Sequence, residues 1–166
     1  MSGNFITRLL LMSDAAWERH ANPWSVWTRI VTCLPLFTLA VWSRAWIGWG
    51  AVIPVLISLL WIWLNPRVFP VPKSLDNWAS QGVLGERIWL ERKRIAIPRR
   101  YLVTGRILLL IGTVGLIPYA WGLWAQSLRY VLIGGFLLYA GKLGYFAEMS
   151  SLCRAEKAAG GFSRTA

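Results

Sequence analysis

Four long apolar runs dominate the pattern of hydrophobic and polar positions along the 166-residue chain, at residues 27–42, 45–64, 102–124 and 130–149. Each run approaches the roughly 20 residues that a helix needs to cross the hydrocarbon core of a membrane. Lipid offers no partners to free backbone N–H and C=O groups, so helices are expected. Only a few residues separate the runs within each pair. The pattern therefore predicts an all-α fold, a bundle of four transmembrane helices arranged as two helical hairpins.

The polar segments around these runs complete a single membrane domain. Residues 1–20 contain only a short apolar stretch and no small-residue cleavage site, so an interfacial N-terminal helix is expected rather than a signal peptide. A cytoplasmic loop at 65–101 joins the hairpins, and the chain ends in a polar tail at 150–166. Within the loop, residues 75–90 predict an amphipathic helix whose N-cap is Ser74.

The loop helix is expected to have an apolar face and a polar face. A spacing of about 100° per residue defines both faces. The apolar face holds Leu75, Trp78, Ala79, Val83, Trp89 and Leu90, and the polar face holds Asp76, Asn77, Ser80, Arg87 and Glu91. Gly82 and Gly85 are expected to weaken this helix.

Glu86 falls in the middle of the apolar face of the loop helix. A carboxylate shielded from water must pair with a cation or undergo a rise in its pKa. We predict an ion pair that pins the helix to the bundle, with a partner among Arg19, His20, Arg29 and Arg67. A catalytic carboxylate is the alternative.

The distribution of charge predicts the orientation in the membrane. The chain has 18 Lys and Arg against seven Asp and Glu, a formal charge of +11. Basic residues gather in the 65–101 loop and near both ends, whereas the two hairpin turns carry one each, Arg44 and Arg129. The positive-inside rule therefore predicts a bacterial inner-membrane protein with the loop and both termini in the cytoplasm. Many of the twelve Trp fall near the predicted helix ends, which membrane–water interfaces favour.

The strongest basic cluster lies in the second half of the loop. In a soluble protein this charge would suggest nucleic acid, but beside four apolar runs it favours an anionic membrane surface. We predict membrane lipids as partners, no nucleic acid, and lipid contacts by Arg92, Lys93, Arg94, Arg99 and Arg100.

The fourth apolar run has glycines at helical spacing. Gly134, Gly141 and Gly144 would let a neighbouring backbone approach closely, so they predict a helix-packing face. The partner of this face is either another helix of the chain or another protein. Lys142 lies in the same run, where an intramembrane charge either handles a proton or ligand or fixes helix packing.

Candidate chemistry is confined to polar residues that meet at the cytoplasmic surface. If a catalytic site exists, its expected members are His20, Asn22, Arg29 and Glu86. Structural roles are the alternative, because Asn22-Pro23 favours a helix start and Asn65-Pro66 a helix stop. A single histidine cannot build a multi-histidine metal centre, so we predict no metal and no cofactor. We expect bound lipid, and contact of His20 with a pigment stays open.

Residues 17–101, about half of the chain, resemble an uncharacterised family of small prokaryotic membrane proteins. The resemblance rests on residues 19–29 (Arg-His-Ala-Asn-Pro-Trp-Ser-Val-Trp-Thr-Arg), 42–49, 65–70 (Asn-Pro-Arg-Val-Phe-Pro) and 85–98, which begins Gly-Glu-Arg. It implies a membrane protein and no particular reaction.

Three functional hypotheses follow from these features. The small size, the glycine- and Trp-rich helices and the absence of nucleotide-, hydrolase- and metal-binding motifs favour an accessory, scaffold or assembly subunit of a larger inner-membrane complex, such as a respiratory or photosynthetic one. The first alternative is a small enzyme that acts on a lipid or amphiphile at the cytoplasmic surface. The second is a small transporter or channel, for which Lys142 and the prolines of the apolar runs are the only indications.

Overall fold

The computed structural model describes residues 14–92 and 96–160, and every regular element in them is a helix. The expectation of an all-α fold is confirmed for this part of the chain. The elements are α2 (Asp14–His20), α3 (Pro23–Thr28), the π-helix η1 (Arg29–Cys33), α4 (Leu34–Trp42), α5 (Arg44–Ile47), the 3-10 helix η2 (Gly48–Ala51), α6 (Val52–Val68), α7 (Trp78–Leu90), α8 (Arg99–Trp124) and α9 (Leu128–Ala158).

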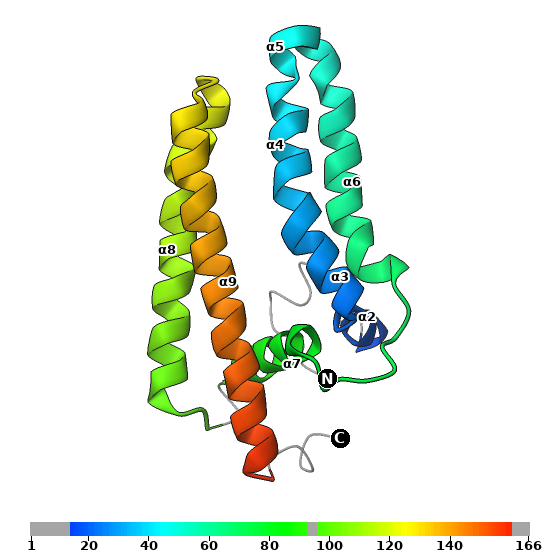
Figure 1. Ribbon diagram of the computed structural model, residues 1–166, viewed down its shortest axis with the longest axis vertical. Coiled ribbons are helices and arrows are strands. Elements are labelled where there is room, and N and C mark those ends of the chain that lie inside the picture. The colour runs from blue at the N-terminus through cyan, green and yellow to red at the C-terminus, as the bar shows by residue number, and fades with distance from the viewer. Residues whose placement is uncertain (1–13, 93–95, 161–166) are drawn as a thin grey trace.

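The helices form two hairpins with α7 between them at one end (Figure 1). In the first hairpin, α3, η1 and α4 form one bent rod that lies beside α6; in the second, α8 lies beside α9. Three helical stretches of the described chain are long and apolar enough to cross a membrane, namely Pro23–Val68, Arg99–Trp124 and Leu128–Ala158. The first stretch reverses direction at α5 and η2, where Gly48 takes the left-handed backbone that a side chain disfavours (φ 53°).

Several predicted helix limits are wrong. The turn of the first hairpin lasts until Ala51, so its second long helix begins at Val52 rather than at residue 45. That helix continues to Val68 through Asn65-Pro66, the expected stop, because the buried Asn65 bonds to α3 and secures the last turn. The last helix continues to Ala158, nine residues beyond the predicted limit of 149, because α7 packs against its second half.

Close backbone contacts hold α8 and α9 together. A methyl group on Gly141 would lie 2.5 Å from the backbone N of Gly112, and one on Gly134 would lie 2.3 Å from that of Tyr119. Real contacts of that kind do not occur, so only glycine fits at either position. Gly144 faces a Leu108 side chain, which can move. The structure therefore places all three of the predicted packing glycines against α8 of the same chain.

The short helix α7 touches both hairpins. A methyl group on Gly82 would lie 2.3 Å from the Phe146 ring, and one on Gly85 would lie 1.8 Å from the carbonyl O of Met149. These two glycines, expected only to weaken the helix, are where α7 lies directly on α9. On its other side, Ser80 Oγ donates a hydrogen bond of 2.6 Å to the carbonyl O of Ala21, and Trp78 stacks on Trp27. α7 therefore joins the two hairpins at one end of the molecule.

Two expectations about the loop helix are wrong. Its N-cap is Asn77 rather than Ser74, since the Asn77 carboxamide accepts a hydrogen bond of 2.9 Å from the Ser80 N–H. Ser80, expected on the polar face, is fully buried. Its hydroxyl can be buried because the carbonyl O of Ala21 accepts its hydrogen bond. Ala21 is 59 positions away in the chain, so helical spacing does not indicate this contact.

Side-chain hydrogen bonds hold α3 against α6. Asn65 is fully buried; its Oδ1 accepts from Ser25 Oγ at 3.1 Å and its Nδ2 donates to Thr28 Oγ1 at 2.8 Å. One turn further along, Trp61 Nε1 donates to Thr32 Oγ1 at 3.0 Å. The first hairpin thus has a ladder of polar side chains where the second has glycines.

Candidate functional site

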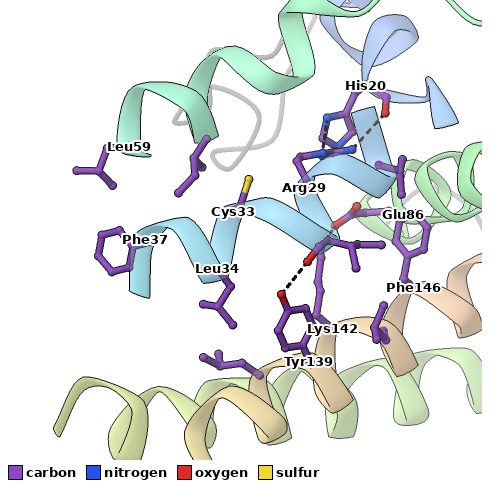
Figure 2. A pocket seen from close by; sticks show the side chains of 15 residues that line it. His20, Arg29, Cys33, Leu34, Phe37, Leu59, Glu86, Tyr139, Lys142 and Phe146 are labelled. Carbon is purple, nitrogen blue, oxygen red and sulfur yellow. Dashed lines mark hydrogen bonds and ion pairs between the residues drawn. The ribbon is translucent and has the colours of Figure 1, made fainter. Parts of the chain in front are cut away.

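A cavity of about 480 Å³ lies between the two hairpins. Its walls come from the rod of α3, η1 and α4, from α6 and from α9, while α2 and α7 each contribute one side chain (Figure 2). The lining is mostly hydrophobic, and the charged side chains gather at the end nearest α2 and α7. A largely apolar cavity with a few convergent polar groups is typical of a site for a small molecule.

Arg29 and His20 form a rigid contact at the polar end. Arg29 Nη1 lies 2.8 Å from Nδ1 and 2.6 Å from Nε2 of His20, and Nη2 donates to the His20 carbonyl O at 3.3 Å. Arg29 Nε donates to the carbonyl O of Ser25 at 3.0 Å. These bonds fix the guanidinium at the first residue of the π-helix, a form of helix that is frequent at functional sites.

The imidazole of His20 is neutral. The pKa of His20 falls from 6.5 to about 2. Burial is the largest cause, the charge of Arg29 is the second, and the charges of Lys142 and Arg67 have smaller effects. A general base works best with a pKa near the operating pH. His20 is therefore better suited to accept a hydrogen bond and orient Arg29 than to transfer protons.

Glu86 forms its ion pair with Lys142 of α9. Its Oε1 lies 3.8 Å from Lys142 Nζ, and the Glu86 side chain is 21% exposed against 58% for Lys142. Glu86 is thus shielded, as its place on the apolar face suggested, but the expectation of a partner in the 19–29 segment or at Arg67 is wrong. Because Gly85 lets α7 lie directly on α9, the Glu86 carboxylate comes close to Lys142 of α9. The helical spacing of the sequence does not indicate that α9 is the neighbour of α7.

Away from this end the walls are apolar, with Leu34, Phe37, Leu59 and Leu138 among the lining residues. Tyr139 also lines the cavity, and its hydroxyl donates a hydrogen bond of 2.7 Å to the carbonyl O of Ile30. This bond joins α9 to the π-helix across the space between the hairpins (Figure 2).

The remaining predicted site residues lie outside the cavity lining. Asn22 is the N-cap of α3: its Oδ1 accepts from the Trp24 N–H at 2.9 Å, with Pro23 in the first turn, so the expected helix start is confirmed. Its Nδ2 donates to the carbonyl O of Pro70 at 2.9 Å, which ties the start of the loop to α3. Asn22 therefore has a structural role.

The basic cluster is divided between two helix ends. Arg92 lies over the Trp89 ring with 4.1 Å to its centre, and Arg100 lies over the Tyr101 ring at 4.4 Å. Arg99 and Arg100 are exposed at the start of α8. Lys93 and Arg94 lie outside the described residues.

Comparison with known proteins decides the family. A model of the family described as "Family of unknown function (DUF6653)" matches residues 5–165. The chain belongs to DUF6653. The match spans both hairpins, whereas the resemblance seen in the sequence covered only residues 17–101. The family match confirms the expectation of an uncharacterised family. Neither a search of curated proteins nor a search of solved structures finds a match.

Sequence reasoning about this DUF6653 chain missed most of the cavity. Cys33, Phe37, Leu59 and Tyr139 line it but lie in apolar runs, where a residue that faces lipid and one that faces a cavity look alike. Among the cavity-lining residues of the last apolar run, Lys142 was the one with a signal in the sequence, because it is a charge within that run. Within the described residues, no group of three or more His, Cys, Asp or Glu side chains could hold a metal ion.

Proposed function

We propose that this DUF6653 protein binds one amphiphilic molecule, such as a lipid, between its two hairpins, with the polar end of that molecule at the cytoplasmic membrane surface. The observation that carries the proposal is the cavity of about 480 Å³, whose walls are apolar and whose one end holds His20, Arg29, Glu86 and Lys142. An amphiphile has the same division into an apolar body and a polar end.

A membrane setting is supported by the large apolar surface of the hairpins. Ile53, Ile117, Leu132 and Phe136 are among many large hydrophobic side chains that are more than half exposed. A soluble monomer seldom exposes contiguous apolar surface on this scale. We infer four crossings, made by the α3–η1–α4 rod, α6, α8 and α9.

Exposed Trp side chains support the position of both membrane surfaces. Trp24 lies in α3 and Trp63 near the end of α6, at the α7 end of the first hairpin. Trp49 lies in η2 and Trp124 ends α8, at the opposite turns, and all four are at least half exposed. Trp is enriched at both membrane–water interfaces. With the positive-inside rule, this arrangement supports the bacterial inner membrane, with the α7 end and both termini in the cytoplasm.

Binding is favoured over catalysis by the state of the polar groups. The only histidine, His20, is neutral and hydrogen-bonded to Arg29, and Glu86 is paired with Lys142. The enzyme hypothesis would use these same groups as acid or base, for which the Arg29–His20 contact is poorly suited.

Native mass spectrometry after extraction in a gentle neutral detergent tests the proposal. The protein should retain one amphiphile per chain, and Leu143→Trp, which places a larger side chain in the cavity wall, should abolish retention. Leu132→Trp is the matched control, because Leu132 lies on the same helix and is 62% exposed. Equal retention by both variants would contradict the proposal.

The hypotheses of an accessory subunit and of a transporter stay predictions. The same purification addresses both, since a stable assembly with other membrane proteins supports an accessory subunit, and a bare homo-oligomer supports a transporter or channel. Either role is compatible with a bound amphiphile.

A further inference from the structure

Two cationic side chains at the polar end of the cavity have hydrogen-bond donors to spare. Arg29 has five N–H groups. The hydrogen bonds to Ser25 and His20 among the described residues occupy one N–H on each of its three nitrogens, which leaves one on Nη1 and one on Nη2. Two parallel N–H groups of a guanidinium match the two oxygens of a carboxylate or phosphate.

Lys142 offers the second cation. Its Nζ is 3.8 Å from the Glu86 carboxylate, which is beyond hydrogen-bonding distance, and its side chain is 58% exposed. A loose pair of this kind leaves the ammonium donors available to a closer acceptor. In the view of Figure 2, Lys142 extends from α9 toward Glu86 at the same end of the cavity as Arg29.

The charges at this end do not balance. Arg29 and Lys142 contribute two positive charges, Glu86 contributes one negative charge, and His20 is neutral. An uncompensated cation beside apolar walls is unfavourable, and a bound anion would compensate it. The excess of donors and the excess of positive charge therefore indicate the same kind of ligand.

We propose that the amphiphile held in the cavity is a single-chain molecule with an anionic head, a carboxylate or a phosphate, bound between Arg29 and Lys142. This inference rests on the proposed function and specifies its ligand. The single chain follows from size, because about 480 Å³ lies in the lower half of the roughly 300–1,000 Å³ that encloses a drug-sized ligand. This volume does not enclose both chains of a diacyl phospholipid.

Glu86 sets the selectivity of the site. Its carboxylate competes with the ligand for Lys142, so an anionic head must bind more favourably than Glu86 does. A cationic head would instead meet Arg29, with Glu86 as its only acidic partner among the lining residues. We therefore expect the site to select against cationic amphiphiles.

Titration of the full-length protein in a neutral maltoside detergent tests this inference, with binding followed by native mass spectrometry. The probes share one alkyl chain and differ in the head: dodecyl phosphate, dodecanoate, dodecanol and dodecyltrimethylammonium. The two anionic probes should bind about tenfold more tightly than the neutral and cationic ones, as expected for charge-assisted hydrogen bonds. The ratio between phosphate and carboxylate distinguishes the two head chemistries.

Variants sharpen the test. Lys142→Gln should weaken binding of the anionic probes about tenfold, and Glu86→Gln should strengthen it several-fold, because the competing charge is gone. Lys157→Gln is the control, since Lys157 lies on the same helix but pairs with Asp76 at 2.9 Å and does not line the cavity. Arg29 is left intact, because its bonds to Ser25 and His20 also stabilise the fold.

The outcomes separate the two proposals. If dodecyltrimethylammonium binds as tightly as dodecyl phosphate, the anionic head is wrong while amphiphile binding stands. If folded Lys142→Gln binds anions as the native protein does, the placement of the head between Arg29 and Lys142 is wrong. If no probe binds, the proposed function itself fails.

Discussion

The two hairpins of this protein achieve helix pairing by different means. In the second hairpin, α8 and α9 meet backbone to backbone at glycines such as Gly141 and Gly134. In the first, the pairing depends on hydrogen bonds from side chains, centred on the buried Asn65. Close packing tolerates no added atom, whereas a few directional bonds leave the rest of a helix surface free. The first hairpin can therefore supply most of the cavity wall while the second serves as a fixed support.

The contrast extends to how the hairpins meet each other. Among the described residues, three hydrogen-bonding contacts join them at different heights: Tyr139 to Ile30, Thr38 to Tyr119, and Arg44 to the end of α8. Arg44 Nη2 donates to the carbonyl O of Leu123 at 2.8 Å and also to that of Trp124. The arginine at the first hairpin turn thus caps the neighbouring hairpin.

The largest expected effect is on the glycine interface. Gly141→Ala should lower the free energy of unfolding by about 3 kcal/mol or more, because the added methyl group would overlap the backbone of Gly112, which cannot rotate away. Gly135→Ala is the matched control, since nothing lies within 4 Å of its added methyl group. Thermal unfolding in detergent measures both. Equal midpoints for the two variants would mean that α8 and α9 are not in backbone contact.

A smaller effect is expected at the polar ladder of the first hairpin. Asn65→Leu should lower the free energy of unfolding by about 1–3 kcal/mol, because the Ser25 and Thr28 hydroxyls lose their partner in a buried place. Asn77→Leu is a control for loss of an amide at the partly exposed cap of α7, where about 1 kcal/mol is expected. If the Asn65→Leu variant has the same free energy of unfolding as the native protein, the first hairpin is held by apolar contact alone.

The polar end between the hairpins should give the protein a pH-dependent stability. His20 has a pKa of about 2 when folded, whereas the ordinary histidine pKa of 6.5 applies to the unfolded chain. Below pH 6.5 the unfolded state therefore binds one more proton, so stability decreases as the pH falls from 6.5 toward 2. At about pH 5.5 the loss should be about 1.4 kcal/mol relative to neutral pH.

His20→Asn isolates this contribution. The variant keeps a hydrogen-bond acceptor for Arg29 but has no group that titrates in this range. Thermal midpoints of both proteins near pH 7.5 and pH 5.5 give the difference in slope. Identical slopes would show that His20 is accessible to protons in the folded state.

The smallest expected effect is at the Thr38–Tyr119 contact between the hairpins. Thr38 Oγ1 and the Tyr119 hydroxyl lie 2.7 Å apart, and such bonds between membrane helices contribute about 0.6 kcal/mol on average. A double-mutant cycle with Thr38→Val and Tyr119→Phe should give a coupling energy of that size. Additive single effects would leave Tyr139–Ile30 and Arg44 as the direct hydrogen bonds between the hairpins in the described part of the chain.

Much of the local structure could be predicted from hydrophobic pattern and helix-start chemistry. The all-α fold, the approximate limits of α8 and the N-cap at Asn22 depend on neighbouring residues in the chain, so the sequence indicated them. The start of the second helix was misplaced, because the turn before it, which ends with η2, has an apolar composition like that of the helix itself. The continuation of α6 through Pro66 was missed because Asn65 is held by α3, a distant segment.

The sequence by itself determined that this chain is helical and apolar, that Glu86 is shielded and that the glycines of the last helix suit close packing. Only the tertiary structure decided that Glu86 pairs with Lys142, that Gly82 and Gly85 are contact points and that a cavity separates the hairpins. Periodicity reports which face of a helix avoids water, but it does not report which neighbour that face meets. In an apolar run, lipid, a packed helix and a cavity all favour the same side chains, so only the three-dimensional arrangement distinguishes them.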